Sequence, residues 1–346
     1  MNVFRQLYRG ETSFDFISTT KRVFIVSGIL FTVVLGSLLF RGFEGSVDFT
    51  GGVVIDAQNR ANADITAVRD ALGDIGISDA RVQFTDSGTV LIQTEALGNA
   101  DQDALVQAVA AVAGVEAAET NLNAVGPTFG AEIARSAVKA LVIFLIVVAL
   151  YISWRFEWKM ALASLVALFH DLAVTVGVYS LLGIVVTPAT VIAILTILGY
   201  SLYDTVVVFD KLRENIEEIG TRSSFAEIAN LSMNQVLMRS INTSMTSLVP
   251  VGSLLVVGSF LLGAATLRDF ALALFIGIVA GTYSSIFIAT PLLTIWKQRE
   301  PEWSRVANRT EGVAVATAPE VMVKAAPKKA ASTAPARAPK SRKKRR

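Results

Sequence analysis

Asp204 is an acidic side chain inside a long apolar part of the chain, where a charge is energetically costly. It follows 32 residues, Leu172–Tyr203, that carry no charged side chain, and another apolar segment, Thr205–Phe209, comes after it. A carboxylate at the centre of a membrane helix costs ~2.5–3.5 kcal/mol on insertion scales, so a function is the default interpretation. The chemistry of a desolvated carboxyl suits a proton carrier. The alternative is a structural acid that is hydrogen-bonded to neighbouring helices.

Hydroxyl groups share the predicted helix face with Asp204. Thr196, Tyr200 and Tyr203 precede it at helical spacing. Hydroxyls one turn apart beside an acid can order water molecules, and a proton path needs such waters. Lys211 follows seven residues after Asp204, which places the carboxylate roughly 10 Å inside the cytoplasmic end of the helix.

Arg239, at the start of a later apolar segment, is a second candidate for the same chemistry. It is either a cytoplasmic flank that follows the positive-inside rule or an inward-turned counter-ion of Asp204. An ion pair that forms and breaks with helix movement would couple proton binding to conformation. The same part of the helix carries further polar side chains and a proline, which we expect to bend it: Asn242, Thr243, Thr246 and Pro250.

His170 and Asp171 form a third polar site, near the middle of another apolar segment. They lie about 16 Å beyond Lys159 along a helix. Adjacent residues point about 100° apart, so they cannot both serve one partner well. Histidine is a natural proton shuttle, and the alternative interpretation is a buried pair that ties its helix to the neighbours.

The composition excludes several kinds of chemistry. The chain has no cysteine and one histidine, which rules out disulfides, thiol nucleophiles and His-rich metal sites. Its sequence shows no phosphate-binding loop and no nucleophile motif with partners. We therefore expect a protein that is not an enzyme, with no metal and no cofactor apart from a transported proton.

Long apolar segments predict an α-helical polytopic membrane protein. The chain is 53% hydrophobic and 17% charged, and apolar runs of 18 residues or more recur. We predict six transmembrane helices, at about 23–40, 138–154, 159–182, 188–209, 239–262 and 269–296. The third and fourth share one long apolar stretch, which Gly183 and Pro188 are expected to break. The first of the six is expected to be a retained signal anchor.

Charges near the helix ends predict the orientation. Lys and Arg gather in the N-terminal segment 1–22, in the loop before residue 239 and in the tail 300–346, so both termini are expected in the cytoplasm of a bacterium, with the bundle 138–299 in its inner membrane. Residues 321–346 carry ten Lys and Arg and no acid. The tail is predicted to be disordered, and either solvated or in contact with anionic lipid or the ribosome.

The segment 41–137, after the first helix at 23–40, is expected outside the cytoplasm as a small α/β domain. It holds 14 acidic and five basic residues. Strands are predicted at 47–57, 81–85, 89–94 and 115–123, with helices at 64–74 and 100–113. This βαββαβ order is that of a ferredoxin-like domain. Gly126-Pro127 is predicted to be a hinge into the second membrane helix.

Several motifs, in order along residues 1–300, resemble those of the SecF branch of the SecD/SecF family of protein-export membrane proteins, within the resistance-nodulation-division superfamily. The resemblance rests on five stretches: GSVDFTGG at 45–52, VGP at 125–127, FHD at 169–171, LGYSLYDTVVVFD at 198–210 and RSINTSMT at 239–246. The long basic tail is not part of the resemblance.

The resemblance implies a function in protein export. It implies a heterodimer with SecD, work beside the SecYEG channel, and use of the proton-motive force in late steps of moving unfolded preproteins across the membrane. It implies that Asp204 and Arg239 belong to the proton pathway, with His170, Asp171, Asn242 and Tyr200 as possible auxiliary residues. Two rival classes are a small-molecule exporter of the same superfamily and a translocon assembly factor in which Asp204 is structural.

Overall fold

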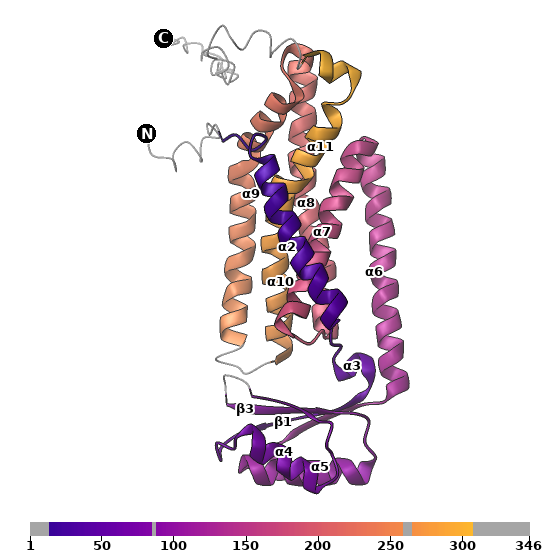
Figure 1. The fold of residues 1–346 in the computed structure, drawn as a ribbon, viewed down its shortest axis with the longest axis vertical. Helices are drawn as coiled ribbons and strands as arrows, with labels where there is room; N and C mark the ends of the chain where they lie inside the picture. The colour runs from indigo at the N-terminus through magenta and orange to yellow at the C-terminus, as the bar shows by residue number, and fades with distance from the viewer. Residues whose placement is uncertain (1–13, 85–87, 259–264, 307–346) are drawn as a thin grey trace, which may run out of the picture.

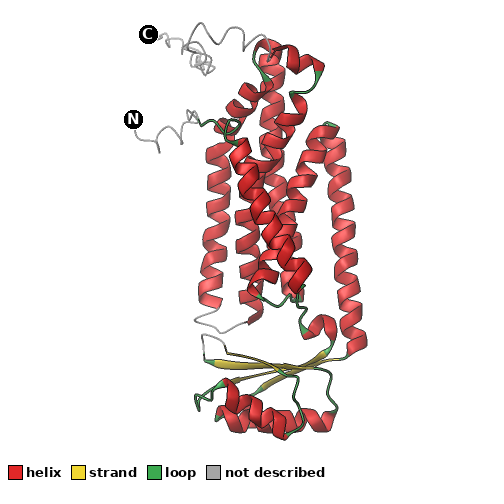
Figure 2. Ribbon diagram, in the orientation of Figure 1, coloured by secondary structure: helices red, strands yellow, loops and turns green. Residues whose placement is uncertain are grey.

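The computed structural model shows a bundle of long helices with a small sheet domain at one end (Figure 1). It describes residues 14–84, 88–258 and 265–306. Figure 2 shows the strands gathered at that one end, between the bundle and the shorter helices of the sheet domain. The bundle and the sheet domain are therefore two layers stacked along the long axis of the molecule.

The main helical segments of the described bundle are α2 (Thr20–Arg41), α6 (Pro127–Arg155), α7 (Trp158–Leu182), α8 (Pro188–Ile219), α9 (Phe225–Val256), α10 (Ala265–Ser284), the π-helical segment η4 (Ser285–Ala289) and α11 (Thr290–Lys297). The break between α7 and α8 lies where the sequence predicts it. Gly183 adopts a left-handed conformation with φ 65° after α7, and Pro188 is the first residue of α8, capped by Thr187.

Five of the described helical segments are long and apolar enough to cross a membrane: α2, α6, α7, α8 and the continuous run from α10 to α11. The chain is thus a multi-pass membrane protein. The remaining predicted span, 239–262, falls on α9 and reaches residues 259–264, which lie outside the described part of the chain. Residues 239–256 of α9 are less apolar than the five segments because they are rich in Ser, Thr and Asn.

The sheet domain has the predicted order of elements along the chain: β1 (Gly52–Gln58), α4 (Ile65–Asp74), β2 (Arg81–Phe84), β3 (Thr89–Thr94), α5 (Asn99–Ala113) and β4 (Asn121–Val125). The strands lie in the order β2-β3-β1-β4, and each neighbouring pair is antiparallel. Alternating apolar residues of the inner strands, such as Ile55 and Ile92, pack against Leu72 and Leu105 of the two helices. The other face of the sheet is turned toward the bundle (Figure 1).

Two predicted strand boundaries are wrong. Residues Val47–Thr50 form a short helix, α3, and not the start of a strand. The amides of Phe49 and Thr50 donate to the Ser46 carbonyl, which closes this turn. At the other end, residues 117–119 form a 3₁₀ turn and β4 begins only at Asn121.

Gly51 and Gly52 connect α3 to β1 at a point where the backbone is crowded. Their φ angles are 78° and 139°, which side chains disfavour. A Cβ on Gly51 would lie 2.5 Å from the Cα of Pro127, and one on Gly52 would lie 2.3 Å from the carbonyl oxygen of Thr94. The pair is therefore required by the close approach of α6 and β3.

The sheet domain is joined to the bundle by more than its two chain connections. Glu44 and Ser46 exchange backbone hydrogen bonds with Val186, in the turn between α7 and α8. Arg81 on β2 pairs with Glu44 and also donates to the carbonyl of Gly183 at 3.4 Å. We refer to residues 44–46, Arg81 and 183–186 as the domain root.

The end of the bundle away from the sheet domain extends into the segment predicted as a disordered tail. Residues 301–306 are helical, and the buried Trp303 packs edge-on against Phe225 with ring centroids 5.2 Å apart. Glu300 forms an ion pair with Lys159 at 2.8 Å and a second one with Lys297. The prediction of disorder is wrong for these residues, and the rest of the tail, 307–346, lies outside the described residues, as do residues 1–13.

Glu300 generates a prediction about this end of the molecule. Burial raises its pKa, but the hydrogen bond from Lys159 and the charges of Lys297 and Lys159 outweigh that effect and lower the pKa below the usual 4.5. The stabilisation it provides is thus complete above pH 4.5 and is lost as the pH falls through the lowered pKa. Glu300→Gln should weaken the packing of Trp303 at neutral pH by about 1–2 kcal/mol, as expected for a hydrogen bond to a charged group.

The measurement is the emission of Trp303, with the other three tryptophans replaced by phenylalanine. At pH 7, the Trp303 emission of Glu300→Gln should have the red shift that the protein with Glu300 shows only in acid. Glu302→Gln is the matched control because Glu302 is exposed. Equal spectra for the two variants would contradict the assigned role of Glu300.

Candidate functional site

Asp204 lies on α8 and is buried, with 7% of its surface exposed. One carboxylate oxygen, Oδ1, accepts a hydrogen bond of 2.8 Å from the Ser240 hydroxyl of α9. The other oxygen, Oδ2, is buried and has no hydrogen-bond partner among the described residues. A buried acceptor without a partner is costly unless water or a proton reaches it.

A small pocket lies beside Asp204. Its volume is about 20 Å³, enough for a single water molecule. Residues of three helices line it: Tyr200, Ser201 and Asp204 of α8; Thr243, Ser244 and Ser247 of α9; and Ile278, Gly281 and Thr282 of α10. Because hydroxyl groups surround the space, a water molecule there would find the polar partners it needs.

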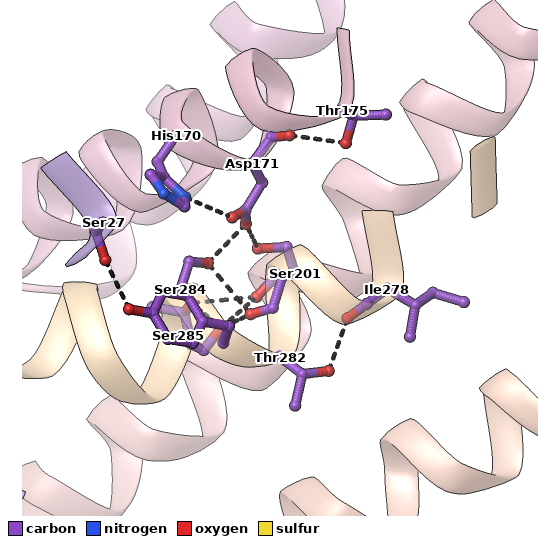
Figure 3. A network of polar contacts seen from close by, with 12 residues as sticks. Ser27, His170, Asp171, Thr175, Ser201, Ile278, Thr282, Ser284 and Ser285 are labelled. Atoms are coloured by element: carbon purple, nitrogen blue, oxygen red, sulfur yellow. Dashed lines mark hydrogen bonds and ion pairs between the residues drawn. The ribbon is translucent and has the colours of Figure 1, made fainter. Parts of the chain in front are cut away.

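Asp171 on α7 is fully buried and accepts hydrogen bonds from two other helices (Figure 3). Its Oδ2 accepts from the Ser201 hydroxyl of α8 at 2.5 Å and from the Ser284 hydroxyl of α10 at 2.7 Å. Its Oδ1 lies 3.2 Å from Nδ1 of His170. Asp171 thus makes the contacts of the alternative interpretation, in which the pair ties its helix to the neighbours.

His170 points toward α2 and α10. Its ring lies 6.2 Å from that of Phe31 and 6.4 Å from that of Tyr283, whose hydroxyl is hydrogen-bonded to Ser27 at 2.6 Å. His170 Nε2 is buried and has no partner among the described residues. The two side chains face different neighbours, and they also contact one another, because His170 Nδ1 turns back onto Asp171.

Arg239 does not contact the carboxylate of Asp204 in this structure. Its guanidinium donates to the Tyr203 hydroxyl at 2.9 Å and lies over the Tyr203 ring at 5.9 Å. Asn242 is also exposed on this side of α9. The counter-ion expected for Asp204 is replaced by Ser240, the next residue along the helix.

The predicted hydroxyl face of α8 is turned mostly outward. Thr196, Tyr200 and Tyr203 are exposed, and only Tyr200 lines the pocket. The buried polar face consists instead of Ser201, Asp204 and Thr205, which repeat at the three- and four-residue spacing of one helix face.

Sequence reasoning missed the serines that donate to the two carboxylates. Ser201, Ser240 and Ser284 are each nearly or fully buried in apolar helices. A recognisable signal exists on α9, where Ser240 and Ser244 are one turn apart and the Ser244 hydroxyl meets that of Thr282 on α10 at 2.7 Å. Another lies on η4, where Ser285 meets Thr205 at 2.8 Å; π-helical segments of this kind are frequent at functional sites.

Two glycines of α10 bring that helix close to α8. A Cβ on Gly277 would lie 2.2 Å from Ile197, and one on Gly281 would lie 2.9 Å from the Cβ of Ser201. Small residues four apart are the usual means by which membrane helices approach closely. This approach places Ser201 and Ser284 on the same carboxylate oxygen of Asp171.

Comparison with known proteins identifies the family to which this architecture belongs. Residues 105–299 match the family described as protein export membrane protein SecD/SecF, C-terminal. The chain belongs to the SecD/SecF family. It is 42% identical over 306 residues to the protein translocase subunit SecF of Streptomyces coelicolor, covering 88% of this chain and 82% of that protein. The protein translocase subunit SecF of Rhodothermus marinus is 37% identical over 309 residues, which cover 86% and 98% of the two chains.

A solved structure of this family has the same fold. The crystal structure of SecDF from Thermus thermophilus, described as a translocon-associated membrane protein, matches with a TM-score of 0.75 and 33% identity over 86% of this chain. This chain spans 42% of that SecDF chain. Asp171, Asp204 and their serine partners all lie within the part that the SecD/SecF family description covers.

The contact between α8 and α10 can be tested at Gly281. Gly281→Ala should force the two helices apart, since the added methyl group would overlap Ser201. We expect a loss of about 1–3 kcal/mol of stability, the usual cost of overpacking, and a loosened contact between Ser284 and Asp171. The check is the thermal unfolding of the purified protein in detergent.

Gly199→Ala is the control for this substitution. Gly199 lies on α8 two residues before Ser201, and a Cβ there would have no atom within 4 Å. The control should unfold at the temperature of the parent protein or slightly above it, because alanine favours a helix. Similar unfolding temperatures for the two variants would show that α8 and α10 do not require this glycine.

Proposed function

We propose that this chain is a non-enzymatic subunit of a protein translocase, which acts with a SecD partner beside the SecYEG channel. In this proposal, the pair uses the proton-motive force across a bacterial inner membrane to drive late steps of preprotein export. The support is membership of the SecD/SecF family, with relatives named protein translocase subunit SecF and a SecDF protein in which the matching part belongs to one longer chain.

The proposal includes six membrane spans with both termini in the cytoplasm. Five described segments qualify by length and composition, and α9 would supply the sixth. The start of α2 and the end of α11 lie at the end of the bundle away from the sheet (Figure 1). We further propose that the sheet domain is ferredoxin-like, because its antiparallel order β2-β3-β1-β4 is what a split βαβ arrangement produces.

The observation that carries the proton coupling is Asp204 itself, whose Oδ2 has no partner among the described residues and whose side chain lines a space for one water. A carboxyl in an apolar bundle is costly as an anion, so it gains from taking up a proton. A pocket water gives that proton a route. No cofactor is needed, because the transported proton itself is what the site binds and releases.

Arg239 gives this exchange a mechanical output. In the present arrangement, its guanidinium is held by Tyr203. When Asp204 loses its proton, the new negative charge attracts the guanidinium from the adjacent helix, and α9 moves relative to α8. Each charge that crosses 100 mV releases ~2.3 kcal/mol, which biases a two-state element roughly fortyfold.

The sheet domain would use this movement to hold and release an unfolded preprotein. Its edge strands, β2 and β4, leave backbone groups free to pair with an extended chain, without sequence preference. Crosslinks from a stalled preprotein that consistently avoid residues 41–125 would refute this part of the proposal.

Asp204→Asn tests the function. The amide keeps an acceptor for Ser240 but cannot carry a proton, so proton flux in vesicles that contain the chain and its SecD partner should fall to background. Export driven by an imposed proton gradient should fall with it, while the two subunits still co-purify. The measurement is the quenching of a pH-sensitive dye, together with protease protection of an exported preprotein.

Asp210→Asn is the control on the same helix. Asp210 pairs with Arg155 at the cytoplasmic end and is 41% exposed, so its variant should keep most of the flux. If Asp204→Asn instead left flux and export intact but prevented co-purification with SecD, the chain would be an assembly factor.

A further inference from the structure

We propose that Asp171 is a second proton-exchanging carboxylate, connected to Asp204 through the pocket and the hydroxyl of Ser201. The proposal rests on the proton-coupled function proposed above and extends its path toward α7. What carries it is one side chain with two contacts: Ser201 lines the pocket that Asp204 also lines, and its hydroxyl donates to Asp171 at 2.5 Å.

A proton that moves from the pocket to Asp171 needs to pass through one side chain, Ser201, which contacts both. Ser201 and Asp204 are three residues apart on α8, so they share a helix face. Both reach the same space of about 20 Å³. In the proposed path, one water molecule there bonds to both Asp204 Oδ2 and Ser201 Oγ, which its capacity for two to four hydrogen bonds allows.

The titratable groups around Asp171 are few among the described residues. His170 is its neighbour on α7, Tyr283 of α10 lies against the His170 ring, and Asp204 of α8 lies across the pocket. The contact from α2 is Phe31, which does not titrate. On α9, Arg239 is hydrogen-bonded to Tyr203. No described basic group, apart from the histidine itself, forms an ion pair with Asp171.

The transfer step is balanced in protons and charge. Protonated Asp204 gives its proton to the pocket water, the water gives one to Ser201 Oγ, and Ser201 gives its own proton to Asp171 Oδ2. Asp204 becomes an anion, Asp171 becomes neutral, and the water and the serine end as they began. A hydroxyl can carry out this exchange because it has one donor and two acceptor positions.

Ser284 can adapt to the neutral form of Asp171. Its hydroxyl donates to Asp171 Oδ2 at 2.7 Å but also lies 3.2 Å from the carbonyl oxygen of Gly281. When Asp171 carries a proton, Ser284 can donate to Gly281 and accept from Asp171 instead. The Asp171 anion accepts a hydrogen bond from Ser284 of α10, whereas neutral Asp171 donates one to it. The proton exchange therefore alters the hydrogen bonds that join α7, α8 and α10.

The experiment compares variants of the complex with SecD in vesicles. Asp171→Asn and Ser201→Ala should each lower the proton flux by about tenfold or more, which corresponds to roughly 1.4 kcal/mol or more. Ser180→Ala is the matched control: Ser180 is equally buried on α7 and hydrogen-bonded to Ser37 of α2, but lies outside the pocket. Its flux should be unchanged.

Infrared spectroscopy supplies a readout that a purely structural acid would not change. After a drop in pH, the parent protein should show two buried carboxylic C=O bands, one lost in Asp204→Asn and one lost in Asp171→Asn. In Ser201→Ala the Asp171 band should appear about tenfold more slowly. Ser201→Ala keeps Asp171 in place, so it tests proton exchange at Asp171 even if Asp171→Asn does not form the complex with SecD.

The outcomes separate the two proposals. Full flux in Asp171→Asn and Ser201→Ala, with flux abolished in Asp204→Asn, would overturn the role of Asp171 and leave the proposed function standing. The same holds if no band is lost in Asp171→Asn, or if Ser201→Ala leaves the rate of the Asp171 band unchanged. Full flux in Asp204→Asn would instead refute the proton coupling itself.

Discussion

The close contact between α8 and α10 is the constraint on which the polar site depends. A carboxylate inside an apolar bundle needs hydrogen-bond donors within about 3 Å, and serine side chains are too short to supply them across a normal helix spacing. Gly277 and Gly281 remove the side chains that would hold the two helices apart. As a result, Ser201 and Ser284 converge on one oxygen of Asp171.

The two buried carboxylates are solvated very differently by this packing. Asp171 has no exposed surface and two serine donors on one oxygen, with His170 at the other. Among the described residues, Asp204 has one donor, Ser240, and its other oxygen has no partner, while the residue lines a water-sized space. The carboxylate of Asp171 thus has more hydrogen-bond donors than that of Asp204, so a proton that passes between them moves between two unlike environments. Ser201 lies between the two carboxylates, so a change in the protonation of one alters the hydrogen bonding available to the other.

Local features of the chain were predictable from sequence, because they depend on neighbouring residues alone. Gly183 and Pro188 end and begin helices by their own backbone preferences, and Asp64 caps α4 by accepting from the amide of Ala67. Alternating apolar residues similarly reveal β3. Val47–Thr50 was predicted as part of a strand but forms a helical turn, because the amides of Phe49 and Thr50 donate to the Ser46 carbonyl. Gly51 and Gly52, which have positive φ angles, then start β1 after this turn.

The inward face of a membrane helix was not predictable in the same way. Every face of α9 between Arg239 and Pro250 carries hydroxyls or an amide, so hydrophobic periodicity does not distinguish them. Which face turns inward is decided by the partner helices: Ser240 meets Asp204 on α8, and Ser244 meets Thr282 on α10. A difference of one residue, from Arg239 to Ser240, rotates the expected face by about 100°.

The same helices lead from the carboxylates to the sheet domain. The turn at 183–187 joins α7, which carries Asp171, to α8, which carries Asp204. That turn is hydrogen-bonded through Val186 to Glu44 and Ser46, and through Gly183 to Arg81 on β2. A shift of α7 against α8 therefore pulls directly on the domain root. The predicted hinge at Gly126-Pro127 lies at the other connection, where α6 begins at Pro127 and runs unbroken to Arg155. Gly51 and Gly130 bring the start of α6 against the backbone of residues 49–51, where an added Cβ would collide, so α6 and the sheet domain are packed closely at this second connection.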